Sequence, residues 1–83
     1  MPRRSPFQIR LTPEETSELK RRARSHTLEY RKVVRARMIL LAAQDISNDE
    51  IAARLETRRE VVSRWRKRFF ENRLQGLNGG LTH

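Results

Sequence analysis

The sequence predicts an all-helical fold, a small bundle of four helices, and three observations lead to it. Apolar residues recur three and four positions apart over most of the chain, which is the spacing of one helix face. Three segments match a helix start, in which Ser or Thr is followed three residues later by Glu. Alternation of apolar and polar residues, which is typical of a strand, is confined to 7–11.

The chain is expected to begin with a basic arm and a short first helix. Residues 1–11 are basic and hold two prolines, and a few apolar side chains would attach them to the helices. The first helix is expected at 13–25. Thr12 can cap it, and Pro13 suits its first position because no N–H is needed there. Its inner face offers Leu19 and Ala23 and little else.

The second helix, expected at 29–44, carries enough apolar residues to be the centre of the core. The stripe that it would turn inward consists of Tyr30, Val34, Met38 and Leu41, with Val33 and Leu40 beside it. Its basic residues are Arg31, Lys32, Arg35 and Arg37. They either contact phosphates or are simply solvated, and both interpretations stay open.

Two further helices complete the predicted domain. Only Glu56 and Thr57 separate a helix expected at 48–55 from one expected at 58–73, whose cap is either Thr57 or Arg58. Two helices joined so closely are typical of a helix-turn-helix. The predicted organisation is an arm at 1–11, a helical domain at 12–75 with the helix-turn-helix at 48–73, and a flexible tail at 76–83.

The helix at 58–73 has two contrasting faces. Val62, Trp65 and Phe69 share one side at helical spacing, so we expect Trp65 in the core and not on a base. The other side and its flanks present polar groups of the kind that a second helix offers to the major groove. The candidate DNA-binding residues there are Arg58, Arg59, Ser63, Arg64, Arg66, Lys67 and Arg68. Arg66 and Arg68 lie nearer the flanks, where phosphates would pass.

The charge of the chain favours a polyanionic partner. Nineteen Lys and Arg stand against ten Asp and Glu, which gives a formal net charge of +9. Such a field attracts nucleic acid, and double-stranded DNA is the partner we expect. Arg3 and Arg4 of the arm could enter a minor groove, although a plain basic terminus is an equal alternative. A solvated charged face is the alternative for the helix at 58–73.

The same composition argues against several other classes. Cysteine is absent, which removes disulfides and thiolate metal sites and agrees with a cytoplasmic, nucleoid-associated protein. No segment approaches the roughly 18 apolar residues of a membrane span, so no membrane partner is expected. We find no catalytic constellation, metal-ligand set or phosphate loop. We therefore expect no enzyme activity, cofactor or small-molecule substrate.

Several segments, in their order, resemble the N-terminal domain of mariner-related bacterial insertion-sequence transposases. They are Leu11-Thr12-Pro13-Glu14-Glu15, Arg35-Ala36-Arg37-Met38-Ile39-Leu40-Leu41-Ala42-Ala43, Ile51-Ala52-Ala53-Arg54-Leu55, Val61-Val62-Ser63-Arg64-Trp65-Arg66-Lys67-Arg68-Phe69 and Leu74-Gln75-Gly76-Leu77. The resemblance covers about 10–78. It implies a homeodomain-like fold that binds the terminal inverted repeats of a mobile element, with Arg59, Ser63, Arg64 and Lys67 on the recognition face.

The chain departs from that family at the turn and in its extent. Many members have glycine where this chain has Glu56, and full-length members continue into a catalytic domain with three carboxylates. Two roles therefore stay open, the DNA-end-binding part of a transposase and a free-standing dimeric transcriptional regulator. A homodimer would suit either role, because one module has a small contact area. An RNA-binding adaptor is a further alternative.

The charge analysis predicts that DNA binding weakens steeply with salt. If about four to eight phosphates are neutralised, log K should fall against log salt concentration with a slope of roughly −4 to −7. Titration of a fluorescent duplex at several salt concentrations measures this slope. A response that is flat with salt would contradict an interface built on phosphate contacts.

Overall fold

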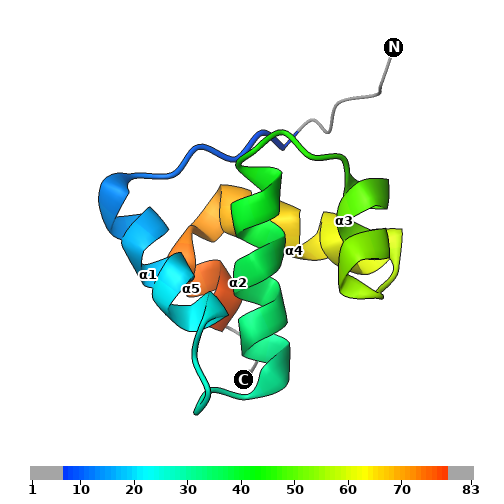
Figure 1. Ribbon diagram of the computed structural model, residues 1–83. Coiled ribbons are helices and arrows are strands. Elements are labelled where there is room, and N and C mark those ends of the chain that lie inside the picture. The colour runs from blue at the N-terminus through cyan, green and yellow to red at the C-terminus, as the bar shows by residue number, and fades with distance from the viewer. Residues whose placement is uncertain (1–6, 79–83) are drawn as a thin grey trace.

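The computed structural model describes residues 7–78, and within them the fold is all helical, as predicted. Five helices are present where four were expected: α1 (Pro13–Ala23), α2 (Tyr30–Ala42), α3 (Asn48–Leu55), α4 (Arg59–Asn72) and α5 (Leu74–Asn78). In Figure 1, α2 runs through the middle of the molecule, with α1 on one side and α3 on the other. No helix among the described residues has the length and apolar character of a membrane span.

The first helix begins with the predicted capping box. The Glu15 N–H donates to Thr12 Oγ1 at 3.1 Å, and the Thr12 N–H donates to Glu15 Oε1 at 3.0 Å. Two orphan amides are thereby satisfied. The helix ends at Ala23, two residues before the expected end. There the guanidinium of Arg37 on α2 donates to the Ala23 carbonyl, through Nε at 3.4 Å and Nη2 at 3.3 Å.

The second helix is central, as predicted, but it is rotated relative to the expected stripe. Its buried residues are Val33, Ala36, Met38, Ile39 and Ala42. Tyr30, which the spacing placed in the core, is 75% exposed. Several elements cover α2, because α1, α3, α4 and α5 all pack against it. A helix covered this way buries small residues such as alanine where neighbouring backbones approach. The spacing of large apolar residues does not predict that these alanines are buried.

The core lies where α1, α2, α3 and α4 meet. The side chains that are fully enclosed are Phe69, Leu19, Ile39, Ile51 and Val62. Trp65 is 8% exposed and belongs to the same cluster, so its predicted place in the core is confirmed. Burial of large apolar side chains of this kind supplies most of the driving force for folding in a small domain.

The segment before α1 packs against the helices. Ile9 is buried in the core cluster, and the rings of Phe7 and Phe70 lie 5.4 Å apart between centroids. Residues 7–11 are therefore part of the folded body, so only the residues before them could act as the predicted arm. Those residues, 1–6, lie outside the described part of the chain.

The prediction of a flexible tail at 76–83 is wrong for residues 76–78, which belong to α5. Arg73 ends α4 with φ 56° and ψ −140°, and α5 then folds back so that Leu77 is only 3% exposed. Gly76 sits against the backbone of α4, where an added Cβ would approach the Arg68 carbonyl oxygen to 2.4 Å. Gly76 is thus required for the close packing of α5 on α4. Residues 79–83 lie outside the described residues.

An ion pair holds the junction between α4 and α5. Arg73 Nη2 lies 2.6 Å from Glu15 Oε1, and its Nε donates to Glu15 Oε2 at 2.9 Å. The same guanidinium donates to the Arg10 carbonyl. The hydrogen bond from Arg73 holds the pKa of Glu15 below its ordinary value. One carboxylate therefore caps α1 and also fixes a residue whose backbone is in an unfavourable conformation.

The turn between α3 and α4 generates a prediction about stability. Glu56 ends α3 in the left-handed conformation, with φ 56° and ψ 47°. Glycine adopts this conformation without the steric penalty of a Cβ, so Glu56→Gly should stabilise the fold by about 1 kcal/mol. For a domain of this size that corresponds to a rise in Tm of roughly 4–8 °C.

Thermal unfolding followed by circular dichroism measures this shift, with Glu56→Ala as the matched control. Alanine also removes the carboxylate but keeps the Cβ, so its Tm should stay near that of the wild type. An equal rise in both variants would assign the effect to the lost charge and not to the backbone.

Candidate nucleic-acid interface

The geometry of the helix-turn-helix is set by its caps and its turn. The Ser47 hydroxyl accepts from the Glu50 N–H at 3.2 Å and opens α3. After the left-handed Glu56, the Thr57 N–H donates to the Ala52 carbonyl at 2.9 Å and closes the end of α3. Arg58 then occupies the cap position of α4, without a hydrogen bond from its side chain. Of the two caps considered from the sequence, Arg58 is the one observed.

The outer face of α4 gathers the main predicted residues on one surface. A shallow depression in this surface is lined by Arg59, Glu60, Ser63, Arg64 and Lys67. Their side chains point away from the core because Val62, Trp65 and Phe69 occupy the opposite face. The predicted grouping of Arg59, Ser63, Arg64 and Lys67 is therefore observed as a geometric fact. Whether they contact DNA stays a prediction.

The cations of the outer face are available to a ligand. Arg59 Nε lies 3.6 Å from Asp49 Oδ1, but both side chains are mostly exposed, so this pair is weak and a phosphate could displace it. Within residues 7–78, no acidic side chain forms an ion pair with Arg58, Arg64 or Lys67. Guanidinium and ammonium groups exposed in this way suit phosphates and base edges.

Arg66 is the predicted site residue that the structure removes from the interface. It is 3% exposed, and its Nε donates to the Phe7 carbonyl at 2.7 Å. Its Nη1 donates to the Ile46 carbonyl at 3.2 Å and to Asn48 Oδ1 at 2.9 Å. Burial lowers the pKa of Arg66, and the charge of Asp45 opposes that shift. Arg66 is a structural residue, and the prediction of a phosphate contact at this position is corrected.

Arg68 lies on the flank of α4 that faces α2, and Arg35 lies on α2. Arg68 is half-buried and its Nε donates to the Gly76 carbonyl at 3.2 Å, so it links α4 to α5. The guanidinium carbons of Arg35 and Arg68 lie 3.9 and 5.1 Å from the centroid of the Trp65 ring. Cation–π contacts of this kind attract both guanidinium groups to the indole ring. Arg3 and Arg4, the remaining predicted residues, lie outside the described part of the chain.

The arrangement defines a class of protein. A short helix, a tight turn and a second helix with an exposed basic face form a helix-turn-helix, the unit that places its second helix in the major groove of DNA. A family model described as a homeodomain-like domain matches residues 29–78, which is more than half of the chain, and the chain belongs to this family. No curated protein and no solved structure shows significant similarity to it.

The family assignment indicates DNA as the partner. It extends from the start of α2 to the end of α5, and leaves α1 and the segment before it outside the matched region. Among the described residues, no group of three or more His, Asp or Glu side chains could hold a metal ion. The outer face of α4 offers cationic and polar groups for contact with a ligand.

The burial of Arg66 predicts a large loss of stability when it is truncated. Arg66→Ala would remove the donor to two carbonyls and to the part-buried amide oxygen of Asn48, at a cost of about 3 kcal/mol. Urea unfolding followed by circular dichroism measures the change in the free energy of unfolding. Lys67→Ala, one position along the helix and exposed, should change it by less than about 0.5 kcal/mol. Equal effects at the two positions would show that Arg66 has no special structural role.

Proposed function

We propose that this protein binds double-stranded DNA in a sequence-specific manner, with α4 in the major groove. The observation that carries the proposal is the outer face of α4, where Arg64 and Lys67 are exposed without an acidic partner among the described residues. A guanidinium so presented can make a bidentate contact with guanine. Ser63, beside them, can both donate and accept a hydrogen bond.

We further propose that the DNA recognised is the end of a mobile element. The resemblance to transposase N-terminal domains supports this role, because it extends over several segments in a fixed order, from Leu11 to Leu77. Pairing of two element ends would use a homodimer, and the protein would act at the nucleoid. A free-standing regulator of the same fold is the alternative role. Sites selected from genomic DNA distinguish the two, since inverted repeats that border an element support the first and a palindromic operator the second.

The proposal predicts that residues on the outer face of α4 determine specificity. Arg59→Ala or Arg64→Ala should narrow the ratio of affinities between a selected site and random duplex, by about 1–3 kcal/mol per lost bidentate contact. Selection from a random pool supplies the site, and competition binding of each variant with both duplexes at one salt concentration measures the ratio.

Arg31→Ala is the matched control. Arg31 lies on α2, is mostly exposed and pairs only weakly with Glu29, with Nη2 and Oε2 3.2 Å apart. Its removal should lower both affinities by similar factors, because a phosphate contact does not depend on the base sequence. Variants of α4 that keep the full specificity ratio would show that another element reads the bases.

A further inference from the structure

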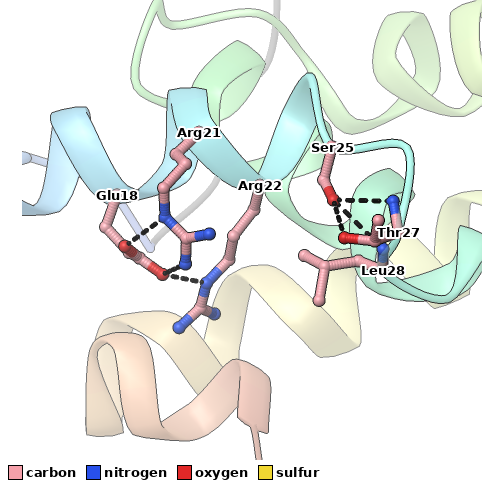
Figure 2. A network of polar contacts seen from close by, with 6 residues as sticks. All are labelled: Glu18, Arg21, Arg22, Ser25, Thr27 and Leu28. Carbon is pink, nitrogen blue, oxygen red and sulfur yellow. Dashed lines mark hydrogen bonds and ion pairs between the residues drawn. The ribbon is translucent and has the colours of Figure 1, made fainter.

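A small pocket lies between α1, α2 and α5, apart from the outer face of α4. It has a volume of about 140 Å³ and is lined by Glu18, Arg21, Arg22, Leu28, Lys32, Arg35 and Leu77. Glu18, Arg21 and Arg22 project from one side of α1 (Figure 2), and Leu28 reaches the pocket from the loop that leads to α2. A water molecule takes up about 30 Å³, so the pocket has room for a group the size of a phosphate.

The lining of this pocket is strongly cationic. Glu18 is its one acid, and it accepts from Arg21 Nε at 3.1 Å, from Arg21 Nη2 at 2.6 Å and from Arg22 Nε at 2.7 Å. These hydrogen bonds lower the pKa of Glu18 to about 2, so its carboxylate is charged at neutral pH. Four cations therefore surround one anion. Their mutual repulsion would be relieved by a second anion in the pocket.

Arg35 adds a guanidinium whose donors are not used. It is half-buried, and its carbon lies 3.9 Å from the centroid of the Trp65 ring. Burial lowers the pKa of Arg35, and the charges of Arg31 and Arg68 lower it further. In the part of the chain that the structure describes, no oxygen accepts a hydrogen bond from Arg35. A partly desolvated cation with unused donors is well suited to bind an oxyanion.

The pocket is continuous with the helix-turn-helix. Arg35 also lines the neighbouring depression, together with Glu56 and Thr57 of the turn and Val61 of α4. A duplex that places its major groove over the start of α4 has its sugar-phosphate backbone on either side of that groove. Arg35 lines both hollows and so links the pocket to the surface beside the start of α4.

We propose that the pocket formed by Arg21, Arg22, Lys32 and Arg35 holds a backbone phosphate of the duplex that α4 reads. This inference rests on the proposed function and extends it. The family match begins at residue 29, so α1 and the loop after it add a contact to the homeodomain-like unit. Such a contact fixes the position of the domain on the duplex and carries no base specificity.

The first test removes cations from the pocket. Lys32→Ala and Arg22→Gln should each weaken binding about tenfold, to the selected site and to random duplex alike. Each should also make the salt slope about one unit shallower, because one counterion fewer is released. Arg24→Ala is the matched control, since Arg24 is exposed at the end of the same helix and does not line the pocket. It should leave the slope unchanged.

The second test changes binding in the opposite direction. Glu18→Gln keeps an oxygen that can accept from Arg21 and Arg22 but removes the negative charge from the pocket. Affinity for both duplexes should rise about two- to fivefold. A residue with only a structural role would not tighten binding when it is replaced, so this gain separates the proposal from a loss of folding. Helical circular dichroism of each variant confirms that it is folded.

Three results would overturn the inference. If folded Lys32→Ala binds as tightly as the wild type, while Arg64→Ala still loses specificity, the pocket is not used and the proposed function stands. If the wild type has no affinity for duplex DNA, both proposals fail together. If the pocket variants bind one duplex normally but no longer bring two labelled duplexes into energy-transfer range, the phosphate belongs to a second DNA molecule and not to the duplex that α4 reads.

Discussion

The buried guanidinium of Arg66 is the contact on which the geometry of the helix-turn-helix depends. It joins α4 to the segment before α1 through Phe7, to the α2–α3 loop through Ile46 and to the start of α3 through Asn48. Among the described residues no carboxylate forms an ion pair with it, so its hydrogen bonds all go to uncharged oxygens, and the charge of Asp45 adds only a longer-range attraction. Such a group tolerates few alternative arrangements. It therefore holds α3 and α4 at one angle, and that angle directs the outer face of α4 to solvent.

The positive charge of the chain serves two different purposes. Arg37, Arg66 and Arg73 donate to backbone carbonyls at helix ends or between segments, so their donors stabilise the fold itself. Arg64 and Lys67 stand on the surface without an acidic partner in the described residues. From composition alone, all of these cations would be predicted to contact nucleic acid. In this small domain, arginine side chains stabilise the fold around the core, because they donate to carbonyls at helix ends and pack through their aliphatic stems.

The sequence predicted the helix-turn-helix and its outer face because local spacing determines both. The capping pattern at Ser47 and the positions of Val62, Trp65 and Phe69 are enough to fix the element and its orientation. Arg66 was wrongly predicted to contact phosphates because it is a charged residue. Its position, four residues after Val62, lies on the inner side of the helix. Three features depend on contacts between distant elements, namely the rotation of α2, the fold-back of α5 on Gly76 and the basic pocket. Periodicity within one helix carries no information about them.

The region that defines the family is smaller than the unit that folds. The homeodomain-like match begins at residue 29, yet Ile9 and Leu19 lie in the core and Glu15 holds the end of α4. The matched helices would expose an apolar surface on α2 if nothing preceded them. A relative that has only the matched region must therefore cover that surface in another way, with a different neighbouring segment or a second subunit.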